Sequence, residues 1–255
     1  MRARQLEKTV RTWSLGWLGS GLGGMTRLPV SPWAANPPNR GSSTASGRVR
    51  LYGDIQQAPA MILREPIRTL PGQFDQALLS RIEQAASRAT LQAAHAYMAG
   101  ETGVHRGERD AQVCYLQLDW LTALLKPLID TINRGMGWNF SLTCMEQLQY
   151  GVYGPSGHHG WHADQLLPGT EPTNAGLQRK LSFIISLNEG ADYEGGDFEL
   201  EYGHPESLER RRRVPELRQP GTLVVFPSFI YHRVLPVTRG ERRTLVGFIC
   251  GPPFR

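Results

Sequence analysis

Apolar residues recur every three or four positions in two stretches of the chain. The first stretch runs from Pro71 to about Met98, and the second begins near Asp119, a candidate N-cap residue. This spacing places apolar side chains on one face of a helix. Pro127 lies inside the second stretch, where it should kink or divide the helix. The pattern therefore predicts two amphipathic helices within residues 71–135.

After residue 138 the spacing of apolar residues shortens towards two, the side-chain period of a strand. Short runs of this kind, separated by turn residues, continue to the end, and two of them, KLSFIISL and TLVVF, are continuously apolar, as expected of inner strands. The arginines at 210–213 interrupt the series and are expected to form a solvated loop. The strands are typical of an antiparallel sandwich or barrel. We therefore expect a mainly β (α+β) domain, with supporting helices over about 71–135 and strands over about 138–255.

Residues 1–58 have a different composition, rich in Gly, Pro, Ser and Arg, with GLGG, NPPN and GSSTASG as linker signals. We expect this segment to be disordered and the folded domain to occupy residues 59–255. The basic start, with interspersed Trp and Leu, is also compatible with a transit peptide within residues 1–30 or a short surface helix. A third alternative is that translation starts further along, since Met61 stands where structured sequence begins.

The net charge of +5 is carried by the first fifty residues, which have a balance of +7 and leave −2 for the rest. The folded part therefore gives no electrostatic reason to expect a nucleic-acid partner. No run approaches the roughly eighteen apolar residues of a membrane span, so no membrane partner is expected. Three scattered cysteines suit a reducing compartment. We expect a cytoplasmic location, or an organellar one if a transit peptide is present.

Two potential metal ligands, His162 and Asp164, lie one residue apart in the segment GHHGWHAD. Side chains alternate along an extended strand, so both would point to the same side and could bind one ion. An H-x-D pair is weak evidence by itself. His232, in the distant run FPSFIYHRVLPV, is the candidate third ligand. Two imidazoles and one carboxylate would form one face of an octahedron and leave positions open for a co-substrate and oxygen.

Four segments follow one another in the order and spacing of a known family: QYGVYGPSGHHGWHAD, RKLSFIISLNE, YEGGDFEL and PGTLVVFPSFIYHRVLPVTRGERRTLVGFICGP. Over about residues 147–252 the chain resembles the Fe(II)- and 2-oxoglutarate-dependent oxygenases, in the branch similar to prolyl 4-hydroxylases. The resemblance implies a double-stranded β-helix, a jelly-roll barrel whose mouth holds iron. It makes His162, Asp164 and His232 the ligands of Fe(II), with 2-oxoglutarate and O2 as co-substrates.

The resemblance also implies a binding site for the distal carboxylate of 2-oxoglutarate. The family's basic residue matches Arg242, and a guanidinium can hold a carboxylate with two parallel charge-assisted hydrogen bonds. Strand alternation places Thr244 on the same face, where it could donate to the same carboxylate, and Arg243 on the opposite face. Tyr153 matches a tyrosine of the family whose hydroxyl could reach the co-substrate.

The chain departs from the closest hydroxylases at His159, where they carry a tyrosine on the co-substrate side. His158 and His159 are expected to lie in a loop or to orient the ligands without binding the metal. Gly195 and Gly196, with no helix after them, are expected to allow a tight bend rather than to bind phosphate.

The activity implied by the resemblance is hydroxylation of an unactivated C–H bond, with release of succinate and CO2 and with ascorbate as a candidate reductant. The expected substrate is a prolyl or other amino-acid residue in a protein or peptide; the alternative is a free amino acid or small metabolite. Two alternatives from other classes are a non-catalytic jelly-roll sensor of a metal or ligand and a zinc hydrolase. Arg242 counts against both, because neither has a use for a buried guanidinium at this position. The sequence leaves the oligomeric state open.

Overall fold

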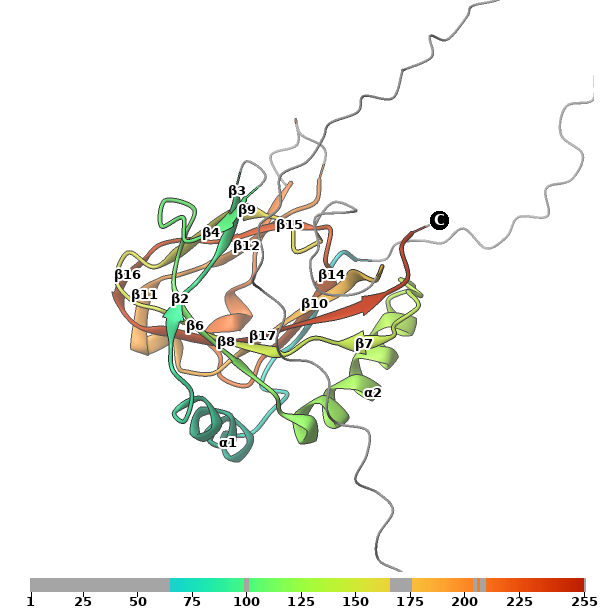
Figure 1. Cartoon of the computed structure of the whole chain (residues 1–255), viewed down its shortest axis with the longest axis horizontal. Coiled ribbons are helices and arrows are strands. Elements are labelled where there is room, and N and C mark those ends of the chain that lie inside the picture. Colours follow the sequence, from blue (N-terminus) through green and yellow to red (C-terminus); the bar gives the residue numbers. More distant parts are fainter. Residues whose placement is uncertain (1–64, 99–100, 166–175, 204–205, 207–209, 255) are drawn as a thin grey trace, which may run out of the picture. The chain divides into compact units, whose positions relative to one another are not determined.

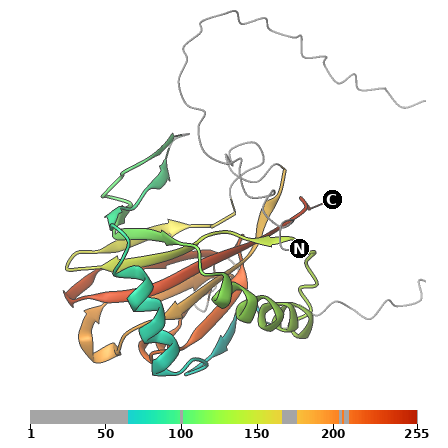
Figure 2. The ribbon, with the colours of Figure 1, turned by 60° about the horizontal axis from the view of Figure 1, so that its bottom comes forward.

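The computed structural model describes residues 65–98, 101–165, 176–203, 206 and 210–254. The predictions made for residues 1–58 lie outside the described residues. The described part is built mainly of antiparallel strands, with helices α1 (Gln76–Ala86) and α2 (Asp119–Gly135) close together on one side (Figures 1 and 2). Neither of these helices has the length and apolar character that crossing a membrane requires.

Most strands belong to two sheets. The larger sheet contains β1 (Arg68–Leu70), β2 (Gln92–Ala93), β6 (Gln112–Leu116), β7 (Cys144–Met145), β8 (Leu148–Tyr153), β10 (Gln178–Ser186), β14 (Leu223–Pro227) and β17 (Arg242–Gly251). The smaller sheet contains β5 (Arg109–Asp110), β9 (His158–His162), β12 (Phe198–Glu201), β13 (Arg211–Arg213) and β15 (Tyr231–Val234). Two ribbons pair β3 (Ala96–Met98) with β4 (Glu101–Gly103), and β11 (Tyr193–Gly195) with β16 (Val237–Gly240). The short 3₁₀ helices are η1 (Gly190–Asp192) and η2 (Pro215–Arg218).

The strand order is β1-β14-β10-β17-β8-β6-β2 in the larger sheet, with β7 beside β17, and β13-β12-β15-β9-β5 in the smaller one. An apolar cluster between the sheets combines Ile184 and Phe226 of the larger sheet with Phe198 and Leu200 of the smaller one. A second cluster packs the opposite face of the larger sheet against α1 and α2. The antiparallel two-sheet architecture predicted from the sequence is confirmed.

Strand β10 shows why its sequence is continuously apolar. Leu181, Phe183 and Ile185 point towards the helices, and Ile184 points into the space between the sheets. Because both faces of the strand are covered, both sets of side chains are buried. Ser182 is a polar residue within this apolar run and is completely buried, and Gln178, Lys180 and Ser186 are further buried polar residues of the strand.

The first helix is shorter than predicted. It begins after Asp75, whose carboxylate accepts a hydrogen bond from the Leu78 amide at 2.9 Å, and it ends at Ala86 rather than near Met98. The residues after it form β2, which pairs with β6, and β3. Alanines in this stretch do not distinguish a helix from a strand, and the open edge of β6 satisfies the backbone groups of β2.

The second helix is continuous from Asp119 through Pro127 to Gly135, so the alternative that Pro127 divides the helix is wrong. Pro127 lies on the exposed face, while the buried stripe of Leu121, Leu125, Ile129 and Ile132 packs against the larger sheet. Leu118, not Asp119, is the N-cap residue, and no side chain caps this end.

The arginine-rich segment is a strand and not a solvated loop. Strand β13 pairs with β12, and Arg211 and Arg213 form ion pairs with Glu201 and Glu199 at 3.0 and 2.8 Å. The acidic partners of Arg210, Arg211 and Arg213 lie on or next to strand β12, and the local sequence of four neighbouring arginines does not reveal them.

Candidate metal centre and co-substrate site

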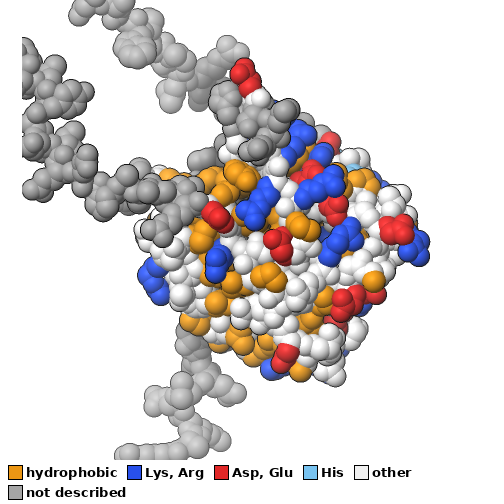
Figure 3. Space-filling model, turned by 180° about the vertical axis from the view of Figure 1, so that it is seen from behind, with side chains coloured by type: hydrophobic (Ala, Val, Ile, Leu, Met, Phe, Trp, Pro, Cys, Tyr) orange, Lys and Arg blue, Asp and Glu red, His pale blue; other side chains and the backbone are white. Residues whose placement is uncertain are grey.

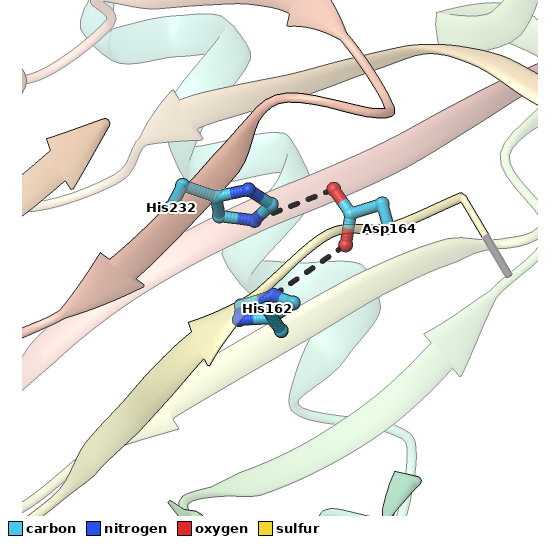
Figure 4. A group of neighbouring side chains, drawn as sticks. All are labelled: His162, Asp164 and His232. Carbon is cyan, nitrogen blue, oxygen red and sulfur yellow. Dashed lines mark ion pairs between the residues drawn. The ribbon is translucent and has the colours of Figure 1, made fainter. Parts of the chain in front are cut away.

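The three residues singled out as metal ligands lie together (Figure 4). His162 is the last residue of β9, and its Cα is the cross-strand partner of His232 on β15. The Asp164 carboxylate lies beside the two imidazoles and contacts both, with Oδ1 3.6 Å from His162 Nε2 and Oδ2 3.5 Å from His232 Nε2. Antiparallel pairing of β9 with β15 is therefore what joins residues seventy positions apart in the sequence.

This group fits a divalent metal ion. Two atoms that each bind one ion at about 2.1 Å can be no more than about 4.2 Å apart, and both contacts of Asp164 meet that limit. The Nδ1 atoms of His162 and His232 lie 2.8 and 2.9 Å from the carbonyl oxygens of Gly160 and Ile230. A carbonyl only accepts, so these contacts place the proton on Nδ1 and leave the Nε2 lone pairs directed at the centre.

The electrostatics of the group favour a cation. Burial, followed by the neighbouring His162, lowers the pKa of His232 to about 4, so its imidazole is neutral at pH 7. Burial alone would raise the pKa of the Asp164 carboxyl, but His232, His162 and the Ser182 hydroxyl together hold it below its usual range. Neutral imidazoles beside a carboxylate are the protonation states that metal binding requires.

Asp164 is not on the strand with His162, as the sequence pattern suggested, but in a bend just beyond its end. The adjacent Gln165 amide donates to the Ser228 carbonyl at 2.9 Å, and the Ser182 hydroxyl donates to Asp164 Oδ2 at 2.6 Å. Sequence reasoning missed both serines. The available signal was Ser182 itself, a polar residue inside the apolar run KLSFIISL.

The two histidines before the ligands have different surroundings. The His159 ring stacks on that of His162 at a centroid distance of 3.5 Å, and burial together with His162 lowers its pKa. His158 instead directs its two ring nitrogens at the carbonyls of Ser156 and Gly107, at 2.9 and 3.1 Å. Only the doubly protonated imidazolium donates to both, and the pKa of His158 is accordingly raised, chiefly by the Ser156 carbonyl. Both histidines lie on strand β9, so the alternative that they form a loop is wrong, and neither belongs to the metal-binding group.

Arg242 is buried in the core with 3% of its surface exposed. Its Cα is the cross-strand partner of Tyr153, and its Cζ lies 5.5 Å from the centroid of that ring. Within the described residues, no carboxylate forms an ion pair with its guanidinium. Thr244 is also buried and shares its face of β17, whereas Arg243 points the other way and pairs with Glu83 at 3.2 Å. The predicted alternation of these three side chains is confirmed.

The glycine pair before β12 forms the tight bend that was predicted. Gly195 and Gly196 have φ values of +71° and +64°, a region that favours glycine. A Cβ on Gly196 would lie 3.1 Å from Cδ of Arg242, so the glycine also allows the arginine to pack closely.

One apolar cluster connects the metal-binding group with Arg242. The rings of Phe226 and Phe198 lie 4.9 and 5.5 Å from that of His232, and both belong to the cluster that includes Tyr153. The candidate ligands and the guanidinium therefore border the same apolar interior between the two sheets.

Comparison with known proteins identifies this arrangement. The family model described as 2OG-Fe(II) oxygenase superfamily matches residues 148–250, a segment that contains all three candidate ligands and Arg242. These residues form a 2OG-Fe(II) oxygenase domain. The family implies Fe(II), 2-oxoglutarate and O2, and the His-Asp-His group described above fits that metal.

Among curated relatives of the oxygenase domain is a PKHD-type hydroxylase of Picosynechococcus sp., 34% identical over 102 residues, which are 40% of this chain and 41% of that protein. A PKHD-type hydroxylase of Sphingopyxis alaskensis is 36% identical over 100 residues, 38% of this chain and 40% of the relative. The chain thus matches about two fifths of the length of each of these curated relatives.

Solved structures share the fold. A Pseudomonas putida prolyl-4-hydroxylase superposes with a TM-score of 0.54 at 21% identity, covering 72% of this chain and 91% of that one. A Trichoplax adhaerens prolyl hydroxylase, solved with a hypoxia inducible factor peptide fragment, superposes with a TM-score of 0.55 at 15% identity, covering 74% of this chain and 87% of that one. The double-stranded β-helix expected from the sequence is therefore confirmed.

Proposed function

We propose that the protein is a 2-oxoglutarate-dependent hydroxylase whose substrate is a prolyl or other amino-acid residue in a protein or peptide. The observation that carries the proposal is Arg242, a buried guanidinium that shares one apolar interior with a His-Asp-His group. Burying a charge without a partner is costly, so a site of this kind calls for an anion. A dicarboxylate that also reaches the metal meets that requirement.

Each residue of the site has a distinct task in this proposal. His162, Asp164 and His232 bind Fe(II), and Arg242 holds the distal carboxylate of 2-oxoglutarate, with Tyr153 and Thr244 as further hydrogen-bond donors. Phe198 and Phe226 exclude water beside His232. When bound, the metal and both co-substrates supply the oxidation, in which 2-oxoglutarate, O2 and R–H give succinate, CO2 and R–OH.

The names of the similar proteins support a prolyl or peptidyl substrate, since hydroxylases of the prolyl type recur among them. Charged side chains of both signs are interspersed on the face shown in Figure 3, and a continuous basic surface that would suit nucleic acid is not seen there. A free amino acid or small metabolite is the alternative substrate of the same chemistry. Ascorbate as reductant and a cytoplasmic location complete the proposal.

The test begins with anaerobic protein reconstituted with Fe(II), to which 2-oxoglutarate is added while the visible spectrum is recorded. A weak charge-transfer band is expected, and it should vanish in Asp164→Ala and require far more co-substrate in Arg242→Ala. Adding air should then yield succinate. Iron binding with no band and no succinate would overturn the enzyme proposal and favour the metal-sensor alternative.

The substrate is tested separately, with a panel of proline-containing peptides and free amino acids. Mass spectrometry should detect the gain of one oxygen atom in a peptide, located by fragmentation, with matched formation of succinate. Oxidation of free amino acids alone would exclude the peptide substrate while leaving the reaction class unchanged.

A further inference from the structure

Two serines link the carboxylate of the metal-binding group to the rest of the fold. The hydroxyl of Ser182, on β10, lies 2.6 Å from Asp164 Oδ2 and 3.0 Å from the hydroxyl oxygen of Ser228, which follows β14. Both serines are fully buried, with 0% of their surface exposed. Asp164 itself lies beyond the end of β9, so the sheet does not fix its side chain.

The direction of these hydrogen bonds follows from their chemistry. A hydroxyl donates and a carboxylate oxygen accepts, so Ser182 donates its proton to Oδ2 of Asp164. Ser182 has then used its only proton, and Ser228 must donate to it. The order is Ser228 to Ser182 to Asp164, in which each donor polarises the next.

The backbone of Ser228 extends this connection. Its amide donates to the Lys180 carbonyl on β10 at 3.0 Å, and its carbonyl accepts from the Gln165 amide, next to Asp164, at 2.9 Å. Three residues further along begins β15, which carries His232. The serine pair therefore connects three segments of the chain: the bend that carries Asp164, strand β10, and the segment that leads to His232 on β15.

We propose that Ser182 and Ser228 are positioning residues that hold the Asp164 carboxylate against His162 and His232 before the metal arrives. The inference rests on the metal site of the proposed function. Without the Ser182 hydroxyl, Asp164 Oδ2 loses its shortest hydrogen bond and the carboxylate is free to rotate away from the imidazoles. Residues that hydrogen-bond to a metal ligand typically contribute about 10- to 100-fold to metal affinity.

The experiment is titration of the metal-free full-length chain with Co(II), whose visible spectrum reports coordination. Ser182→Ala should weaken Co(II) binding about 10- to 100-fold, and Ser182→Thr, which keeps the hydroxyl, should restore most of it. Ser228→Ala should have a smaller effect. Because Ser228 acts through Ser182, adding Ser228→Ala to Ser182→Ala should produce little further loss.

Thr222→Val is the matched control. Thr222 is also fully buried, and its hydroxyl accepts a hydrogen bond from the Gly72 amide at 3.3 Å, at the far end of β14 from Ser228. This variant should lower the melting temperature of the metal-free protein and leave Co(II) affinity unchanged. A structural role alone would move the melting temperatures of the serine variants but not their affinities.

The outcomes separate the two proposals. If the wild type does not bind Co(II), the metal site itself fails. If the wild type binds and Ser182→Ala binds equally well, the positioning role fails and the metal site stands. Equal losses of Co(II) affinity in Ser182→Ala and Ser182→Thr would also overturn the positioning role, because the affinity would then not depend on the hydroxyl group.

Discussion

The guanidinium of Arg242 and the ring of Tyr153 face each other across two neighbouring strands, with 5.5 Å between Cζ and the ring centroid. This contact orients the arginine without neutralising it, because a phenol ring carries no formal charge. The positive charge therefore stays available for an anion in the interior between the two sheets.

Replacing Arg242 should raise the 2-oxoglutarate requirement steeply. We expect Arg242→Lys to weaken co-substrate binding on the order of 100-fold, because it loses a charge-assisted hydrogen bond of the planar fork. Tyr153→Phe should weaken co-substrate binding less than Arg242→Lys, since it removes only one neutral hydrogen-bond donor. The measurement is the 2-oxoglutarate titration of the charge-transfer band. Arg243→Ala, on the opposite face of β17, is the control and should leave the titration unchanged; equal effects at both arginines would contradict the assignment.

A polar contact connects α1 with the larger sheet. The Tyr150 hydroxyl donates to Glu83 Oε2 at 2.7 Å, and Arg243 pairs with the other carboxylate oxygen. Tyr150→Phe should lower the free energy of unfolding by about 1.5 kcal/mol, near the lower end for a hydrogen bond to a charged group, because Glu83 is partly exposed. Urea denaturation measures this loss. Tyr115→Phe, at an exposed tyrosine, should be neutral, and an equally small effect at Tyr150 would show that the contact is dispensable.

The surroundings of His158 predict a pH-dependent stability. Its pKa is raised on folding, so the protonated form stabilises the native state. This contribution is fully present below about pH 6.5, the pKa of an unperturbed histidine, and is lost as pH rises through the folded-state pKa. Glu108 and Asp110 lie nearby and act in the same direction.

The measurement is the melting temperature of wild type and His158→Gln over pH 5.5–8.5. The difference between the two should be largest at the acidic end and shrink as pH rises. A constant difference would show that His158 is not protonated preferentially in the native state.

Gly196 should tolerate no side chain. Gly196→Ala forces a residue with a Cβ to φ +64°, which costs about 1–2 kcal/mol, and the new methyl group would press on Arg242. We expect a lower melting temperature together with weaker 2-oxoglutarate binding. Gly135→Ala, at the end of α2 with no neighbour within 4 Å, is the matched control and should be neutral or slightly stabilising. Unchanged 2-oxoglutarate binding in Gly196→Ala would show that Gly196 does not influence how Arg242 is positioned.

The sequence by itself determined the residue types at the site and the class of fold. Period-two spacing gave the strands, and the alternation of Arg242, Arg243 and Thr244 followed from it, because side-chain direction along a strand is a local property. The candidate ligands were named from their chemistry and spacing, and the structure brings all three together.

Only the tertiary structure decided how the ligands meet and what supports them. The length of α1, the strand character of residues 211–213 and the bend that carries Asp164 all depend on partners distant in the chain. The same holds for Ser182 and Ser228, which are 46 positions apart and become neighbours only because β10 pairs with β14. Local periodicity reports which way a side chain points along its own strand, but which strands pair, and which side chains then meet, depends on packing between residues that are far apart in the chain.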